Sequence, residues 1–207
     1  SPLCRLMERM LTSRIKHKLD YEIDDKQFGF ISGRNCPRAL VHSITNWHSI
    51  IKEHKQCDVV YFDFRKAFDM VSHDILFDKL TAYGFPTTIV NWYKALLSDR
   101  TSLTRVGKSV SSNTLAIKSG VVQGTVSGPL LFLFFINDIK SFLPNGVEYV
   151  LFADDLKIYS HDPSLLQTAV NAVSDWAINN HLPLAPEKIN VIHLGKKNKN
   201  HVYNIDG

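Results

Sequence analysis

Cysteine is scarce in this chain of 207 residues, which contains Cys4, Cys36 and Cys57 and no CxxC pair. Three widely separated cysteines argue against a disulfide framework and a cysteine zinc site, so we expect no disulfide partner. The nine histidines show no HxxxH or HExxH spacing, which argues against a histidine zinc site. The glycines form neither GxGxxG nor a phosphate loop, so a Rossmann nucleotide site is not expected.

Long hydrophobic runs are also lacking. The longest extends from Leu130 to Ile136 and is too short to cross a bilayer, and charged residues interrupt the apolar residues at the start of the chain. We therefore expect no membrane partner and an intracellular location, in the nucleus, the cytoplasm or both. The net charge of +4 permits a nucleic-acid partner without requiring one. With 44% hydrophobic and 21% charged residues, the composition is typical of one folded domain.

Apolar periodicity predicts an irregular alternation of helices and short strands. Helices are predicted over about 3–19, 37–51, 75–83, 86–97, 129–142 and 163–177. Strands are predicted over about 57–64, 146–160 with a break at the Asp pair, and 189–194, with a hairpin over 101–118. This alternation favours an α+β fold, in which an antiparallel sheet carries helices on one face, over a doubly wound parallel sheet.

Two of these helices have apolar stripes that we expect to face the core. The stripes consist of Leu3, Leu6, Met7, Met10, Leu11 and Ile15 in the first helix and of Leu40, Ile44, Trp47 and Ile51 in the second. Asp162 and Pro163 are typical of a helix start, and the following helix should bury Leu166, Val170, Val173 and Ala177.

Acidic residues occur inside otherwise apolar strands. Asp63 ends one such run, and Asp154 and Asp155 lie where two others meet. Taken singly, Asp63 could pair with Arg65 or Lys66, and an Asp pair is common in turns. Taken together, a strand-end carboxylate and a pair on a hairpin tip can converge on two Mg²⁺ ions, as two-metal phosphoryl transfer requires. Carboxylate oxygens are the ligands that Mg²⁺ prefers.

Five motifs follow one another along nearly the whole chain. QFGFISGR begins at Gln27, YFDFRKAFDMVSH at Tyr61, GVVQGTVSGP at Gly120 and FADD at Phe152, and Trp176 is followed by LPLAPEK from Leu182. In this order they resemble a fingers motif and motifs A, B, C and D of a reverse transcriptase. The FADD box and the AFDxVxH stretch are similar to the branch found in non-LTR retrotransposons, of the LINE type and jockey-like.

The resemblance implies a right-hand polymerase fold in one partial domain, 1–207. Its parts would be fingers-like at about 1–56 and 74–118 and palm-like at about 57–73 and 119–207. The first strands of the fingers would precede Ser1, and the thumb would follow Gly207. We therefore expect palm and partial fingers in a fragment without a thumb.

The resemblance also implies roles for charged residues. Asp63, Asp154 and Asp155 would be catalytic carboxylates that bind the metal, with Mg²⁺ expected and Mn²⁺ as an alternative. Lys188 would act as a general acid toward the leaving pyrophosphate, although a solvated lysine at a strand edge is an equal alternative. Arg34 would contact template phosphate, and a surface arginine is equally plausible.

Nucleotide-binding positions are implied at Phe64, Phe68, Gln123 and Gly124. Phe68 falls where the family places an aromatic ring under the sugar, which leaves no room for the 2′-hydroxyl of a ribonucleotide. Gln123 and Gly124 fall where the family contacts the incoming nucleotide and the template base. Glycine suits that position because the backbone can approach a base closely where no Cβ intervenes.

The function that follows is RNA-directed DNA polymerisation, in which a primer 3′-hydroxyl attacks the α-phosphate of a dNTP between two Mg²⁺ ions. The partners would be an RNA template, a DNA primer and dNTPs, and the sequence indicates no oligomeric state. One alternative is a catalytically silent piece that at most binds nucleic acid. Departures from the family pattern motivate it, and they fall at Ile31, Val122, Ser127, Ala185 and Ile189.

A second alternative is another palm polymerase, such as an RNA-templated RNA polymerase or a group II intron maturase. Phe68 argues against the use of ribonucleotides. Phe152 disfavours a maturase, which usually carries Tyr at that position.

Overall fold

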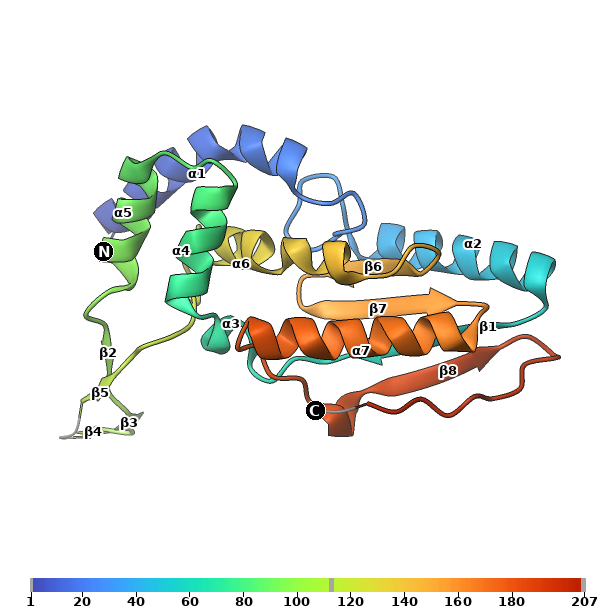
Figure 1. The fold of residues 1–207 in the computed structure, drawn as a ribbon. Helices are drawn as coiled ribbons and strands as arrows, with labels where there is room; N and C mark the ends of the chain where they lie inside the picture. Colours follow the sequence, from blue (N-terminus) through green and yellow to red (C-terminus); the bar gives the residue numbers. More distant parts are fainter. Residues whose placement is uncertain (1, 112–113, 206–207) are drawn as a thin grey trace.

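A computed structural model describes residues 2–111 and 114–205 of the chain (Figure 1). Its α-helices are α1 (Pro2–Glu22), α2 (Cys36–His54), α3 (Ala67–Met70), α4 (His73–Ala82), α5 (Thr87–Leu97), α6 (Gly128–Ile136) and α7 (Pro163–Asn179). Two 3₁₀ helices follow α6 and α7, namely η1 (Asn137–Phe142) and η2 (Pro186–Lys188). Within the described residues, no helix has the length and the hydropathy needed to cross a membrane.

A four-stranded antiparallel sheet forms the centre of the structure. Its strands are β1 (Cys57–Phe62), β6 (Glu148–Phe152), β7 (Asp155–Ser160) and β8 (Asn190–Leu194), in the spatial order β6-β7-β1-β8. The predicted α+β class with an antiparallel sheet is therefore confirmed. In the β1–β7 pairing, Phe62 lies opposite Leu156. The next residues beyond this pair are Asp63 and Asp155, so the register itself brings the two acidic segments to one edge.

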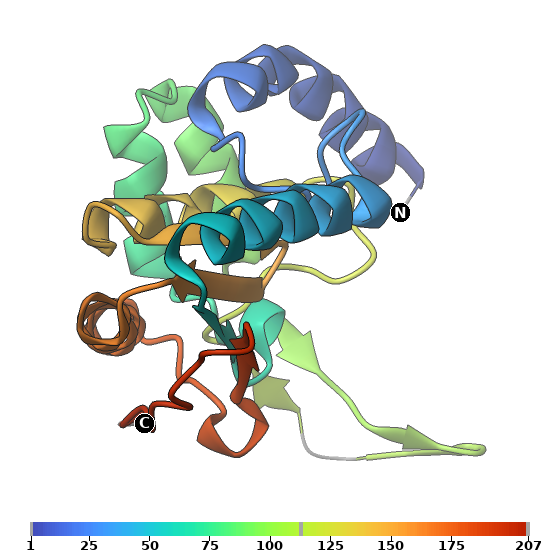
Figure 2. The ribbon, with the colours of Figure 1, turned by 90° about the vertical axis from the view of Figure 1, so that its right-hand side faces the viewer.

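Helices pack on both faces of this sheet. On one face, Val60 and Phe62 of β1 join the large core formed with α6 and α7, and Figure 2 shows α7 beside the strands. On the other face, Cys57 and Val59 pack with Ala39 of α2. Helices therefore cover both faces of the sheet, whereas the sequence predicted helices on one face only. The reason lies in β1, whose consecutive residues Val59 and Val60 are both fully buried and need cover on both sides.

The start and the inner face of α7 are as predicted. One carboxylate oxygen of Asp162 accepts hydrogen bonds from the backbone N–H of Ser164 at 2.8 Å and of Leu165 at 3.3 Å, which satisfies donors that a helix start leaves free. The residues predicted to face the core are buried, namely Leu166, Val170, Val173 and Ala177.

The stripes of α1 and α2 face the core only in part: Ile15 is buried, and Trp47 and Ile51 pack against the core beside α2. Leu3, Met10 and Leu40 are at least half exposed, and α2 buries Ala39 and Ser43 instead. A stripe shows which residues share a helix face, whereas burial depends on whether another element covers that face. Among the described residues, no element covers these exposed apolar side chains.

A hairpin arm projects from the body between α5 and α6. It is made of β2 (Thr101–Ser102) paired with β5 (Leu115–Ala116) and of β3 (Arg105–Val106) paired with β4 (Ser109–Val110). The predicted hairpin over 101–118 is therefore confirmed, except at 112–113, which lie outside the described residues. Figure 2 shows the arm extending to the side of the sheet opposite α7.

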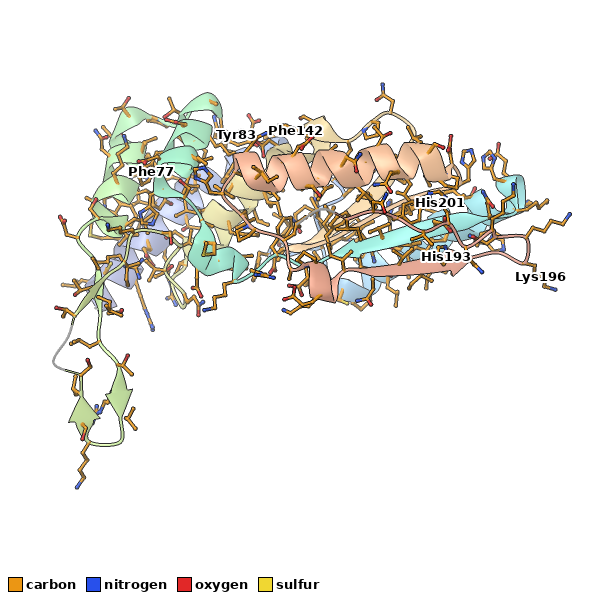
Figure 3. The ribbon with its side chains drawn as sticks, turned by 60° about the horizontal axis from the view of Figure 1, so that its bottom comes forward. Phe77, Tyr83, Phe142, His193, Lys196 and His201 are labelled. Carbon is orange, nitrogen blue, oxygen red and sulfur yellow. The ribbon has the colours of Figure 1, made fainter. Side chains whose placement is uncertain are left out.

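A buried carboxylate ties the segment after β8 to the sheet. Asp58 of β1 accepts hydrogen bonds from Asn198 at 2.6 Å and from the Tyr203 hydroxyl at 2.6 Å, and it pairs with His193 Nδ1 at 2.9 Å. Figure 3 labels His193 on β8 and His201 in the segment after it, which runs back along the strand. This network satisfies a charge that is otherwise costly to bury.

Tyr203→Phe is expected to lower the free energy of unfolding by about 1.5–3 kcal/mol, because it removes a hydrogen bond to a buried charge. Urea denaturation measures the change. Tyr93→Phe is the matched control, since the buried Tyr93 hydroxyl has no hydrogen-bond partner among the described residues. Its effect should stay within about 0.5 kcal/mol of zero or be stabilising. Equal losses in the two variants would contradict this account of the Asp58 network.

Candidate active site

Three carboxylates meet at one edge of the sheet. Asp63 directly follows β1, Asp154 lies in the two-residue turn that joins β6 to β7, and Asp155 is the first residue of β7. The β1–β7 register places Asp63 beside Asp155, as the preceding section shows. The structure therefore brings together the acids that the sequence singles out, from segments about 90 residues apart.

Burial and neighbouring negative charges raise the pKa of two of the acids, Asp154 and Asp155. Burial is the largest cause for Asp154 and raises its pKa above the ordinary 3.8, and the negative charges of Asp155 and Asp63 raise it further. For Asp155, burial again comes first and the charge of Asp63 second, while Lys157 acts in the opposite direction. Burial and the neighbouring negative charges disfavour the charged form, whereas Lys157 at Asp155 and a backbone hydrogen bond at Asp154 favour it, and the net shift of both pKa values is upward. The cluster therefore favours binding a cation or a proton.

Lys188 supplies a cation in this structure. Its Nζ lies 3.2 Å from one carboxylate oxygen of Asp63 and 3.5 Å from the other. Both side chains are substantially exposed, so the pair contributes little to stability. The structure thus places Lys188 at the acids instead of alone at a strand edge, while its role as a general acid stays a prediction.

Backbone hydrogen bonds hold the segment before Lys188 against the acids. The Ala185 N–H donates to the carbonyl of Asp63, and the Arg65 N–H donates to the carbonyl of Pro183, both at 2.8 Å. Phe64 and Leu184 form an isolated antiparallel bridge between these two bonds. This short ladder continues the line of β1 and fixes the approach of η2 to Asp63.

The donor chemistry of the three acids fits a divalent metal, since hard cations prefer carboxylate oxygens. Within residues 2–111 and 114–205, however, no three His, Cys, Asp or Glu side chains are arranged to hold an ion as they stand. Asp63 pairs with Lys188 instead. The three carboxylates are therefore suitable ligands for a divalent metal, but one of them, Asp63, is paired with Lys188 in this structure.

A cavity of about 480 Å³ opens beside the acids, on the side of the sheet that α2 covers. Asp63, Asp155 and Lys188 line it together with Lys157 and Tyr61. Its volume lies in the range of sites that bind small ligands. Asp63 and Asp155 are thus accessible from this side, next to two lysines that favour an anionic ligand.

The loop before α6 carries two of the predicted nucleotide-binding residues. Gln123 donates from Nε2 to a carboxylate oxygen of Asp69 at 2.9 Å and is exposed. Gly124 has φ +76°, a left-handed conformation that favours glycine, and a Cβ there would meet no atom within 4 Å. The glycine is thus explained by its backbone conformation, and the space above it is open to a ligand.

The two predicted aromatic residues lie in different surroundings. Phe68 is half-buried and stacks on Phe132, with ring centroids 4.3 Å apart, and Phe30 packs edge-on with it at a centroid distance of 6.0 Å. Phe64 is buried and packs edge-on against Trp176. A nucleotide contact by the Phe64 side chain therefore disagrees with the structure, because alternation along the strand turns this ring into the core.

The guanidinium of Arg34 makes hydrogen bonds within the chain. Nη1 donates to the carbonyls of Asp24 and Gln27, and Nη2 pairs with Asp25 at 3.0 Å. Its side chain is 19% exposed. The guanidinium therefore shapes the loop that carries the fingers motif, and a contact with template phosphate stays a prediction. Sequence reasoning assigned no role to Gln27, a buried residue of the same loop that touches the Ala153–Asp154 turn.

Asp154→Asn is expected to raise the free energy of unfolding at pH 7 without added divalent cation. The folded state holds the Asp154 proton more tightly than the unfolded state, so ionisation weakens folding as the pH rises above 3.8. The uncharged amide avoids this loss. Below pH 3.8 the carboxyl is protonated in both states, and the gain should vanish.

Denaturation in urea at pH 7 and at pH 3 measures this difference, with Asp175→Asn on the exposed side of α7 as the control. A variant at Asp154 that is less stable than the wild type at pH 7 would contradict the description of the cluster.

Comparisons with known proteins identify the family of the chain. The model of the family described as "Reverse transcriptase (RNA-dependent DNA polymerase)" matches residues 1–203. A polyprotein of the type-1 retrotransposable element R2 from Popillia japonica is 29% identical over 190 residues, which are 85% of this chain and 26% of that protein. The RNA-directed DNA polymerase from mobile element jockey of Drosophila melanogaster is 29% identical over 201 residues, which are 90% of this chain and 22% of that protein.

Among solved structures, telomerase from Candida tropicalis in complex with a TWJ fragment of telomeric RNA matches with a TM-score of 0.69 at 13% identity. The match covers 95% of this chain and 35% of the telomerase chain, and it confirms the predicted palm-type α+β fold.

The chain thus spans about a quarter of the length of the R2 and jockey proteins, and these relatives confirm the predicted resemblance to enzymes of non-LTR retrotransposons. The match of the family's model extends over nearly the whole chain and includes all three acids. The chain belongs to the reverse transcriptase (RNA-dependent DNA polymerase) family.

Proposed function

We propose that the chain forms the catalytic centre of an RNA-directed DNA polymerase of a non-LTR retroelement. It would extend a DNA primer on an RNA template with nucleotides from dNTPs. The observation that carries the proposal is the meeting of Asp63, Asp154 and Asp155 at one sheet edge in a chain of this family. A carboxylate cluster of this kind is what phosphoryl transfer by metal ions requires.

Asp63, Asp154 and Asp155 would hold two divalent ions, with Mg²⁺ expected. When bound, the ions would supply Lewis-acid activation of the attacking hydroxyl and neutralise charge on the leaving oxygens. Asp63 would then no longer need Lys188 as its counter-charge. The Lys188 Nζ would be free to donate a proton to the departing pyrophosphate, which is the role of a general acid.

Phe68 would select deoxyribonucleotides by shape. Its ring stacks on the buried Phe132 and is flanked by Phe30, so it cannot move aside without loss of packing. The backbone at Gly124 and the Gln123 amide would contact the nucleotide and the template base, since the surface over Gly124 is open.

One observation favours the alternative of a catalytically silent piece. The described residues hold no preassembled trio of metal ligands, and Asp63 is paired with Lys188. Primer extension on poly(rA)/oligo(dT) by the 207-residue chain separates the two functions. Incorporation of dNTPs would contradict the silent alternative, whereas an inactive chain that still binds the duplex would support it.

Asp154→Ala is expected to lower Mg²⁺-dependent primer extension by more than about 100-fold, since losing even an outer-shell partner of a metal ligand costs up to that amount. The measurement uses a protein that contains this chain and extends primers. Asp175→Ala, on the exposed side of α7, should leave the rate unchanged. Undiminished extension by the Asp154 variant would refute the metal-site assignment.

Phe68→Ala is expected to reduce discrimination against ribonucleotides by roughly 10- to 200-fold, the range that steric fit in a pocket supports. The ratio of kcat/KM for dTTP and UTP on a poly(rA) template measures it. Phe142→Ala is the control, because Phe142 is an exposed phenylalanine at the end of η1 (Figure 3). A variant of Phe68 that keeps the wild-type ratio would contradict the proposed gate.

A further inference from the structure

A short loop segment runs alongside the outer edge of β6, next to the catalytic turn. The Phe28 N–H donates to the carbonyl of Leu151 at 2.8 Å, and the Leu151 N–H donates to the carbonyl of Lys26 at 2.9 Å. Gln27 and Leu151 form a parallel bridge between these two bonds. The fingers motif therefore adds one step of backbone pairing to the sheet, two residues before Ala153.

The Gln27 side chain continues this pairing where the backbone leaves off. Its Oε1 accepts from the Ala153 N–H at 2.8 Å, and its Nε2 donates to the Ala153 carbonyl at 3.2 Å. Oε1 also accepts from the Gly29 N–H at 2.8 Å. Gln27 is 2% exposed. One buried carboxamide thus satisfies both polar backbone groups of the residue before Asp154.

Ala153 needs this support because its backbone is in the left-handed region. Its φ is +57°, which L-residues with a Cβ rarely adopt. Ala153 is also buried. Without the Gln27 amide, its backbone N–H and carbonyl would therefore lose these hydrogen-bond partners in a place that water does not readily reach. A residue in this state keeps its conformation only where its surroundings fix it.

Gly29 allows the loop to come this close. A Cβ at position 29 would lie 2.3 Å from the backbone N of Ala153, so only glycine fits. The loop is itself anchored at its base. Arg34 donates to the carbonyl of Gln27, and Asp24 binds Lys140 at 3.0 Å and accepts a hydrogen bond from Tyr149 at 2.8 Å. The support for Ala153 therefore rests on a fixed element.

We propose that Gln27 is a positioning residue for the acids. By holding Ala153 in its left-handed conformation, it directs the following Asp154 carboxylate toward Asp63. This inference rests on the proposed function, since it assigns Gln27 to the metal-binding site. It also gives the Gln-x-Gly of the fingers motif a physical task, which is to fix the turn of the FADD box.

The test compares Gln27→Leu with Gln56→Leu in the 207-residue chain. Gln56 is a matched control, because its Nε2 also donates to a backbone carbonyl, that of His161 at 2.8 Å, at the far end of β7. The probe is Mn²⁺ alone, and its affinity is measured from electron paramagnetic resonance of the free ion. Amide hydrogen exchange at Ala153 reports on the turn without any metal.

Gln27→Leu should weaken Mn²⁺ binding by roughly 10- to 100-fold, as loss of an outer-shell partner does, and should speed exchange of the Ala153 amide. Gln56→Leu should leave both quantities at the wild-type level. If Gln27→Leu does not fold, Gln27→Asn withdraws the carboxamide by one methylene, keeps the side chain polar and should show the same two changes.

Two results separate failure of the inference from failure of the proposed function. Mn²⁺ affinity and Ala153 exchange that are unchanged in the Gln27 variants would overturn the positioning role while leaving the metal site intact. A wild-type chain that binds no Mn²⁺ would instead contradict the proposed metal site. In that case, an unchanged exchange rate of the Ala153 amide in Gln27→Leu would still contradict the claim that Gln27 stabilises the turn.

Discussion

The antiparallel pairing of β1 with β7 is the constraint on which the rest of the site depends. It places Phe62 opposite Leu156 and thereby brings Asp63 beside Asp155. A slip of one residue would turn every side chain of β1 to the other face of the sheet. Both faces are packed, with Val59 against α2 and Val60 toward α6 and α7, so the core itself fixes the position of the acids.

Placing three carboxylates at one edge of the sheet lowers the stability of the folded state, and neighbouring residues offset part of this loss. Burial and mutual repulsion raise the pKa values of Asp154 and Asp155, so the ionised cluster opposes folding. Lys188 offsets part of the charge of Asp63. The turn that carries Asp154 is held from outside by the loop of the fingers motif. The proposed metal site is thus built from carboxylates that repel one another when all are ionised.

Much of this architecture could be predicted from the sequence, because hydrophobic runs reveal strands and make acids within them conspicuous. Asp63 and Asp154 were recognisable in this way. The stripe containing Leu40 was misleading, since periodicity identifies a helix face but not whether another element covers it. Phe64 lies in the core because of strand alternation, which a motif does not reveal. The contacts of Gln27 depend on a tertiary approach between residues more than 100 positions apart.

The central claim is that the three acids hold the divalent ions at which nucleotide is transferred. Its most direct test is a crystal structure of the chain with an RNA–DNA duplex, a dNTP and Mn²⁺, with anomalous scattering used to locate the metal. The account predicts Mn²⁺ peaks within about 2.2 Å of carboxylate oxygens of Asp63 and Asp154, with Lys188 released from Asp63. Well-ordered acids without an anomalous peak, and Lys188 still paired with Asp63, would contradict it.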